Sequence, residues 1–277
     1  MKRNRAPAVP VPARQPQEVL PELHPARILE LLTTSRLGRI VALYDDVGST
    51  NAVARAAAAD GVPEGLLVIA EEQRSGRGRK GRIWFSARGK SLTCSLVLRP
   101  ARTDEGLTAI LALAVVEALG EFAGGCGIKW PNDIFCEGKK LGGILAESQR
   151  TFVVLGLGLN INEAAGDFDD SIRGDAVSLS VAAGRRFDRG IVLCRILEEF
   201  EPMYIRFQEG GFAPFRAAVQ HRLLYIGKRV AVDCGGRSFE GNMAGITDAG
   251  YVRLDIDGVE RVFSSGDLTL RKKPPRP

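Results

Sequence analysis

The chain has 277 residues, 45% of them hydrophobic and 26% charged, which is ordinary for a globular protein with one large domain or a large and a small one. Its net charge of +5 is too modest to indicate nucleic-acid binding by itself, and it suits an enzyme that handles several phosphates equally well. The five cysteines form no C-x-x-C pair, which argues against a disulfide framework or a zinc site and favours a reducing, cytoplasmic location.

The N-terminal part is expected to contain an unstructured extension, a helix, a strand and a second helix. Residues 1–22 are rich in Pro, Arg and Ala without periodicity, which predicts disorder, and they lack the apolar core of a secretory signal. A short helix is predicted over Pro25–Leu32 and a strand over Arg39–Tyr44. Ser49-Thr50-Asn51 then precedes an alanine-rich helix that Gly61 ends, a typical capping pattern.

A glycine-rich, cationic loop follows the next predicted strand. The apolar run Gly65–Ala70 is typical of a buried strand, and Gly76–Arg82 after it alternates glycine with Arg and Lys. Glycine lets backbone N–H groups close on an anion that the cations neutralise, so the loop predicts a phosphate-binding site. Its G-x-G-x-x-G spacing does not indicate a dinucleotide fold, because Arg82–Lys90 is unsuited to the helix that must follow. The sequence also contains no G-x-x-x-x-G-K-[ST] phosphate loop.

The middle of the chain contains strands and two long helices, and its end contains only short strands. The predicted helix Thr103–Phe122 includes the longest apolar helical run, which is too short to span a bilayer, and the second is predicted over Asp188–Gln208. The strands of this part are predicted over Ser91–Leu98, Gly127–Trp130, Asp133–Glu137, Lys140–Glu147 and Phe152–Asn160. Those of a small all-β barrel are predicted over Arg229–Cys234, Ser238–Ala244, Tyr251–Ile256, Arg261–Phe263 and Asp267–Leu270.

Three groups of polar and small residues accompany the predicted strands. Lys129–Asp133 contains a proline that cannot join a sheet ladder, so that Asn132 and Asp133 are presented outward. Lys140–Glu147 includes a pair of glycines that permits close approach of a ligand, and Gly156–Asn160 combines small residues with an amide. We expect all three groups to converge on one face of a sheet.

These motifs, in their order and approximate spacing, resemble those of the biotin–protein ligases from roughly Tyr44 to Asn160. The resemblance implies an α+β fold of the class II synthetase-like type, with a mixed, mostly antiparallel sheet and a small C-terminal SH3-like barrel. It places the catalytic domain at residues 23–223 and the barrel at 224–273. It implies that biotin and Mg-ATP form biotinyl-5′-adenylate. A lysine of a biotin carboxyl carrier protein domain, such as that of acetyl-CoA carboxylase, then attacks the mixed anhydride.

The resemblance also assigns roles to single residues. Arg79 is expected to hold the adenylate, and Lys140 to meet the biotin carboxylate and later the acyl phosphate. The residues expected to bind biotin are Ser49, Thr50, Asn51, Gln73, Arg77, Gly78, Arg79, Lys140, Gly143, Leu145 and Gly158. Those expected to bind ATP or to serve its Mg²⁺ are Arg82, Trp84, Lys129, Asn132, Asp133, Asn160 and, in the barrel, Arg271. No metal site made by the protein alone is implied.

Other interpretations of these patterns remain. Ser49–Asn51 can simply cap a helix, Trp84 can be a core residue, and Lys140 can be a surface residue in a turn. A lipoate-type ligase would share the sheet and the loop. A nucleic-acid-binding protein would need exposed aromatic residues beside the cations, and aromatic residues make up only 6% of the chain.

Two segments depart from the family's pattern. The residues before Arg39 are too few for the helix-turn-helix module of the regulatory members, so no operator binding is expected, while a homodimer is left open. The segment expected to fold over adenine, Glu163–Asp175, is strongly acidic in this sequence.

Overall fold

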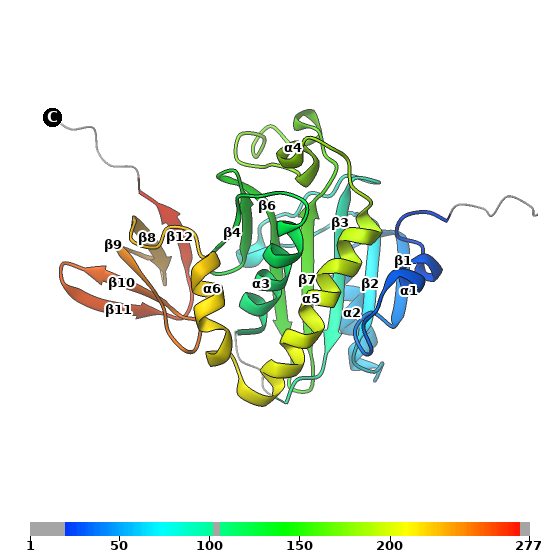
Figure 1. The fold of residues 1–277 in the computed structure, drawn as a ribbon, viewed down its shortest axis with the longest axis horizontal. Coiled ribbons are helices and arrows are strands. Elements are labelled where there is room, and N and C mark those ends of the chain that lie inside the picture. Colours follow the sequence, from blue (N-terminus) through cyan, green and yellow to red (C-terminus); the bar gives the residue numbers. More distant parts are fainter. Residues whose placement is uncertain (1–19, 102–105, 272–277) are drawn as a thin grey trace, which may run out of the picture.

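The larger of two sheets forms the centre of the molecule (Figure 1). The computed structural model describes residues 20–101 and 106–271. The seven strands of the sheet are β1 (Ile40–Val47), β2 (Leu66–Gln73), β3 (Ser91–Leu98), β4 (Cys126–Lys129), β5 (Asp133–Cys136), β6 (Lys139–Ser148) and β7 (Val153–Asn160). Their order is β1-β2-β3-β7-β6-β5-β4, in which β1 and β2 run parallel and the other neighbours antiparallel. The fold is therefore the predicted α+β class with a mixed, mostly antiparallel sheet.

Helices cover both faces of this sheet and divide its core in two. The helices are α1 (Pro25–Leu31), α2 (Thr50–Ala59), α3 (Gly106–Gly120), α4 (Leu179–Ala183), α5 (Arg189–Gly210) and α6 (Arg216–Arg222), with 3-10 turns η1 (Arg79–Gly81), η2 (Ala165–Asp167) and η3 (Ala213–Phe215). α3 and α5 run side by side across one face, and α2 packs against β2, β3 and β7 on the other (Figure 1). In β2, Ile69 belongs to the first of these two cores and Val68 to the second. Because successive strand residues face opposite ways, a strand buried on both faces is a continuous apolar run.

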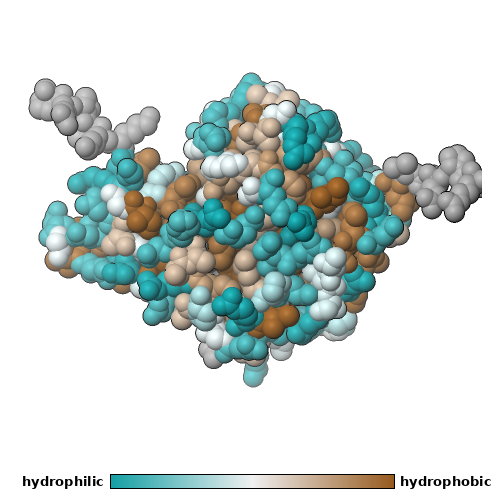
Figure 2. Space-filling view, in the orientation of Figure 1, coloured by the Kyte–Doolittle hydropathy of each residue, from teal (hydrophilic) through white to brown (hydrophobic). Residues whose placement is uncertain are grey.

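The long helix α3 is apolar on nearly all sides, as expected of a buried helix. Both α5 and α6 pack against it. On this side of the molecule the surface is a mixture in which hydrophilic residues predominate (Figure 2). Among the described residues, none of the helices combines the length and the apolarity that crossing a bilayer requires.

The observed elements differ from the predicted ones mainly at their ends. α3 begins at Gly106, whereas Thr103, where its start was predicted, lies outside the described residues. Of the predicted disordered extension, residues 1–19 also lie outside them, but Glu22 is placed and its carboxylate accepts a hydrogen bond from Arg189 Nε at 2.8 Å. The short helices α4 and α6 were not predicted, since five and seven residues are too few for a clear helical period and neither begins with a proline, as α1 does.

A second, five-stranded sheet lies beside the β4 edge of the first (Figure 1). Its strands are β8 (Arg229–Cys234), β9 (Arg237–Ile246), β10 (Val252–Ile256), β11 (Val259–Phe263) and β12 (Asp267–Leu270), all antiparallel in the order β11-β10-β9-β8-β12. The indole of Trp130 donates a hydrogen bond to Gly250 O at 3.0 Å, and Leu224 N donates to Ile128 O at 2.8 Å. These contacts fix the C-terminal sheet against the hairpin of β4 and β5.

Candidate functional site

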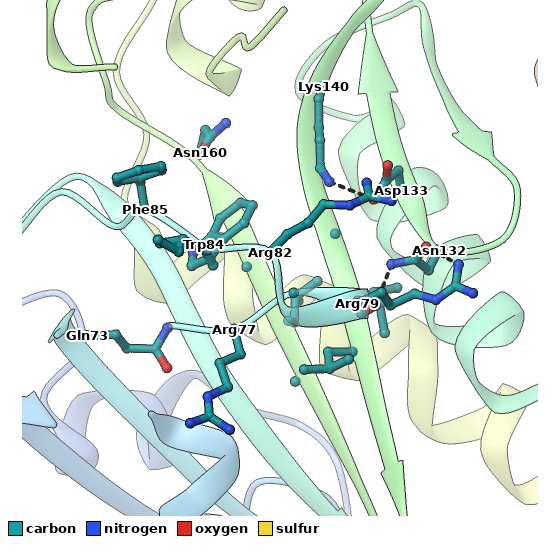
Figure 3. Close-up of a pocket in the computed structure, with 18 of the residues that line it drawn as sticks. Gln73, Arg77, Arg79, Arg82, Trp84, Phe85, Asn132, Asp133, Lys140 and Asn160 are labelled. Atoms are coloured by element: carbon teal, nitrogen blue, oxygen red, sulfur yellow. Dashed lines mark hydrogen bonds and ion pairs between the residues drawn. The ribbon is translucent and has the colours of Figure 1, made fainter. Parts of the chain in front are cut away.

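A cavity of about 290 Å³ lies between the start of α2, the loop of residues 76–82, and strands β6 and β7 (Figure 3). Most of the residues expected from the sequence line it: Ser49, Thr50, Asn51, Gln73, Arg77, Gly78, Arg79, Arg82, Trp84, Asn132, Asp133, Lys140, Gly143, Leu145, Gly158 and Asn160. Neither Lys129 nor Arg271 is among its lining residues. The three groups predicted to converge do meet the cationic loop here.

One end of the cavity is a set of hydrogen-bonding side chains at the start of α2. Gln73 Oε1 accepts from the backbone N–H of Thr50 at 2.8 Å, and Ser95 Oγ lies 2.6 Å from Asn51 Oδ1. Thr50, Asn51 and Ser95 are all buried. Ser49 is the N-cap residue of α2, but within the described structure its side chain makes no capping hydrogen bond. Its hydroxyl is therefore not used by the capping role that the sequence allowed.

Two glycines of β7 make room for side chains that line the cavity. A Cβ on Gly156 would lie 2.2 Å from Asn51 Oδ1, and one on Gly158 would lie 2.4 Å from Trp84 Cε2. Such contacts are far below van der Waals distance, so the amide and the indole occupy the space that a side chain would need. Trp84 Nε1 is buried and has no hydrogen-bond partner among the described residues. The indole thus brings an unused donor to the wall of the cavity.

The cationic loop is held by both neighbouring units of the molecule. Lys80 adopts a positive φ of 55° in η1, which bends the loop so that Arg79 and Arg82 extend toward Asn132 and Asp133, while Arg77 projects the other way (Figure 3). Arg79 Nη1 donates to Asn132 Oδ1 at 3.2 Å and to Gly266 O, in the segment before β12, at 3.3 Å.

An acid of the C-terminal sheet faces three loop cations. Asp267 accepts hydrogen bonds from Lys80 Nζ at 3.0 Å and from Arg82 Nη2 at 2.5 Å, and Arg79 lies 4.0 Å away. Partial burial acts to raise the pKa of Asp267, but the hydrogen bond from Lys80 and the charge of Arg82 outweigh it and hold that pKa below its usual value. Asp267 also lines the cavity.

A lysine–aspartate pair lies on the hairpin side of the cavity. Lys140 Nζ donates to Asp133 Oδ1 at 2.7 Å, and the backbone N–H of Lys140 donates to Asp175 O, also at 2.7 Å. Lys129, the last residue of β4, instead places its ammonium 4.9 Å from the ring centre of Phe135. Burial lowers the pKa of Lys129, as do the charges of Lys140 and Arg82, while Asp133 acts to raise it.

The acidic segment Glu163–Asp175 supplies apolar side chains to the cavity. Phe168 and Ile172 line it, whereas Asp169 and Asp170 are exposed to solvent. Asn160 Nδ2 donates to Val177 O at 3.2 Å and so ties the end of β7 to the chain that follows this segment. These two residues were not assigned from the sequence, and their apolar character within an acidic segment is the signal that could have found them.

Strand β12 reaches the cavity through a residue that the sequence analysis did not assign. Arg271 is exposed, and its Nε lies 3.0 Å from Glu240 Oε1 within the C-terminal sheet. It is Asp267 that reaches the cavity, and no sequence signal pointed to it because the position depends on how the second sheet lies against the first. Among the described residues, no group of three or more His, Cys, Asp or Glu side chains could hold a metal ion by itself.

Comparison with known proteins gives consistent results over both sheets. The pattern of the biotin/lipoate A/B protein ligase family matches residues 47–161, and that of the biotin protein ligase C terminal domain matches residues 225–271. The chain is similar to the bifunctional ligase/repressor BirA of Bacillus subtilis, with 37% identity over 249 residues, which cover 86% of this chain and 76% of that protein. It is 36% identical over 231 residues to the biotin–[acetyl-CoA-carboxylase] ligase of Mycobacterium tuberculosis, covering 80% and 85% of the two chains.

A solved structure shows the same arrangement. The biotin protein ligase from Aquifex aeolicus, in complex with biotin and ATP, superposes with a TM-score of 0.76 at 28% identity. The match covers 85% of this chain and 100% of that one, so it includes the C-terminal sheet as well as the large one.

Proposed function

Because the chain belongs to the biotin protein ligase family, we propose that the cavity described above is where both steps of that family's reaction take place. The enzyme activates biotin with ATP to biotinyl-5′-adenylate and transfers biotin to a lysine of a carrier protein. In the first step a carboxylate oxygen of biotin attacks the α-phosphorus of ATP and pyrophosphate leaves. In the second step the lysine amine attacks the acyl carbon and AMP leaves.

The order of side-chain types along the cavity supports this proposal most directly. Thr50, Asn51 and Gln73 supply hydrogen-bonding groups, and Leu145 of β6 supplies an apolar side chain. Lys140 supplies a positive charge on the side away from Gln73 (Figure 3). Biotin has the same sequence of groups, a ureido ring, an aliphatic tail and a carboxylate. The lining therefore offers a partner for each part of that acid.

The polar end also favours biotin over lipoate. The dithiolane ring of lipoate has no N–H or C=O group, so it could not form the further hydrogen bonds that the buried Asn51 and Thr50 can make with a ureido ring. A site built to hydrogen-bond its substrate rejects an analogue that lacks those groups by about 10⁴-fold or more. A nucleic-acid role for the loop is disfavoured because three of its cations already face Asp267.

The cations remove the main barrier to adenylation. Two unit charges about 4 Å apart repel by about 1 kcal/mol in water and about 4 kcal/mol at an effective dielectric of about 20. Lys140 beside the biotin carboxylate, and Arg79 and Arg82 beside the phosphates, would offset that repulsion and stabilise charge that develops on the phosphoryl oxygens. Arg79 would also retain the adenylate until the carrier arrives.

The nucleotide would occupy the side of the cavity bounded by Trp84, Asn160 and the 163–175 segment. Asn132 and Asp133 lie nearest the arginines and would serve the phosphates. Mg²⁺ commonly binds through one or two carboxylates together with substrate phosphates, so Asp133 suffices as a protein ligand for a metal that arrives with ATP. Lys129 would act on the phosphates through its charge beside Asp133. Arg271 would help to bind ATP or the carrier protein.

We further propose a cytoplasmic location and a catalytic unit of residues 23–223 followed by a C-terminal domain of residues 224–273. All five cysteines of the chain are free thiols, which suits a reducing compartment. The carrier would be the biotin-accepting domain of acetyl-CoA carboxylase or a similar enzyme.

The test is isotope exchange between radiolabelled pyrophosphate and ATP with biotin or lipoate as the acid. Exchange that depends on biotin, together with transfer of biotin to an isolated carrier domain, is the expected result. Exchange that depends on lipoate would make the enzyme a lipoate-type ligase. Exchange with neither acid would contradict acid activation altogether.

A further inference from the structure

A carboxylate outside the cavity accepts a hydrogen bond from one of the amides inside it. Glu147, near the end of β6, does not line the cavity, yet its Oε2 accepts a hydrogen bond from Asn51 Nδ2 at 3.1 Å. The backbone oxygen of Leu145 accepts from the same Nδ2 at 3.4 Å. Both N–H bonds of the Asn51 amide are therefore directed to β6, and none remains for a ligand.

This arrangement fixes which way the amide faces. A carboxylate can only accept hydrogen bonds, so the NH₂ side of Asn51 must face Glu147 and the oxygen must face away from it. The oxygen then lies 2.6 Å from Ser95 Oγ, beside Gly156, where there is no room for a Cβ. Asn51 thus presents an acceptor, not a donor, at the polar end of the cavity.

The orientation of the Asn51 amide determines the hydrogen-bond directions of two hydroxyl groups. Ser95 Oγ lies 2.6 Å from Asn51 Oδ1 and 2.7 Å from Thr50 Oγ1, but a hydroxyl has one proton and can donate to only one of them. Since the amide oxygen cannot donate, Ser95 must donate to it. The Thr50 hydroxyl lies 2.7 Å from Ser95 Oγ and 3.1 Å from Gln73 Oε1, so its one proton is shared between these two acceptors. Gln73 Oε1 remains satisfied by the backbone N–H of Thr50.

We propose that Glu147 is a positioning residue for acid recognition, because it sets the donor and acceptor pattern of the Asn51–Ser95–Thr50 chain. With Glu147 in place, Asn51 Oδ1 accepts from a ring N–H of the substrate and Gln73 Nε2 is free to donate to a carbonyl. Without Glu147, the Asn51 amide can rotate, and its N–H group would then face the ring N–H of the substrate, with which it cannot form a hydrogen bond. This inference rests on the proposed function, since a ureido ring is the acid head group that supplies both N–H and C=O.

Steady-state kinetics of Glu147→Ala test the proposal, with Glu147→Gln as an isosteric variant and Arg55→Ala as the matched control. Arg55 is a partly exposed residue 4.0 Å from Glu147, so its loss removes a neighbour of the carboxylate but leaves the contact with Asn51. We expect the KM for biotin to rise about 5- to 100-fold in Glu147→Ala, with kcat changed less than about 3-fold, because an unpaired amide weakens recognition. Glu147→Gln should show a smaller rise, since its carbonyl can still accept, and Arg55→Ala should match the wild type.

A double variant separates positioning from a general structural effect. If Glu147 acts through Asn51, adding Glu147→Ala to Asn51→Ala should leave the KM of Asn51→Ala unchanged. Additive effects, or a KM within twofold of the wild type in a folded Glu147→Ala, would overturn the proposal. Absence of biotin-dependent exchange in the wild-type enzyme would instead refute the proposed function.

Discussion

Lys140 and Lys80 carry the same charge but lie in different surroundings. Lys140 lines the cavity and donates to Asp133 at 2.7 Å, whereas Lys80 is half-exposed and meets Asp267 at the loop's outer side. Lys140→Ala should lower kcat/KM for biotin by about 30-fold or more, equivalent to ~2 kcal/mol, because it leaves Asp133 and the substrate carboxylate without a cation. Lys80→Ala should lower it by less than about 5-fold, since exposed ion pairs contribute about 1 kcal/mol or less. Equal losses in pyrophosphate exchange would show that Lys140 does not meet the carboxylate.

For single residues, the sequence indicated which residue types form the site better than it indicated where their side chains point. Lys140, Asn132 and Asp133 could be predicted because their motifs place them at strand ends. The direction of Lys129 could not, because alternation along a short strand sends its side chain to the ring of Phe135. Glu147 has no recognisable motif of its own, and its contact with Asn51 joins two elements that are distant in sequence.

Strand β7 contributes to the site through glycines, whose lack of a side chain leaves room for neighbouring residues. A Cβ on Gly158 would lie 2.4 Å from the indole of Trp84, so Gly158→Ala must displace that ring from the cavity wall. Overpacking of this kind costs about 1–3 kcal/mol, and we expect the KM values for biotin and ATP to rise by about 5- to 100-fold. Tryptophan fluorescence should shift at the same time, because Trp84 gains contact with solvent. The strand itself should persist, since Gly158 is not at a positive φ.

The matched control for this prediction is Gly166→Ala in η2. Nothing lies within 4 Å of a Cβ built there, and Gly166 is exposed. Its KM values and its fluorescence should remain those of the wild type. If Gly158→Ala also behaves like the wild type, the indole of Trp84 does not form the wall against which biotin or adenine binds.

The elements themselves were predictable to different degrees. Long apolar runs such as Gly65–Ala70 and the stretch that forms α3 indicate their structure through period and composition alone. The loop of residues 76–82 was predicted to bind phosphate, but not its η1 turn or the positive φ of Lys80, because that geometry depends on contacts with Asn132 and Asp267. Local sequence describes an element well only where the element's partners are local.

On the scale of the whole molecule, the second sheet completes the site. A small all-β unit after about residue 225 was predictable from its short strands and turns, and β8 to β12 confirm it. Its docking beside the β4–β5 hairpin was not, because that depends on single contacts such as the one between Trp130 and Gly250. The docking brings Asp267 to the loop cations, so the C-terminal sheet holds a loop of the catalytic unit through charge.

Asp267→Asn should release the loop from the C-terminal sheet. The variant keeps the shape of the side chain but loses the charge that faces Lys80 and Arg82. Since trypsin cleaves after lysine and arginine in mobile segments, the variant should be cut within residues 76–82 several-fold faster than the wild type when no ligand is present. Added salt should raise the wild-type rate toward that of the variant, because it screens exposed ion pairs.

The pH dependence of this contact follows from the lowered pKa of Asp267. A carboxyl group whose folded pKa lies below its unfolded value of about 3.9 stabilises the folded arrangement above that pH and loses this contribution as the pH falls through the folded pKa. The difference in cleavage between wild type and Asp267→Asn should therefore stay constant from about pH 6 to 8, where the carboxylate is fully charged. Equal cleavage of the two proteins, or a difference that changes within this range, would mean that the loop is held by Arg79 and its neutral partners, Asn132 and Gly266, and not by Asp267.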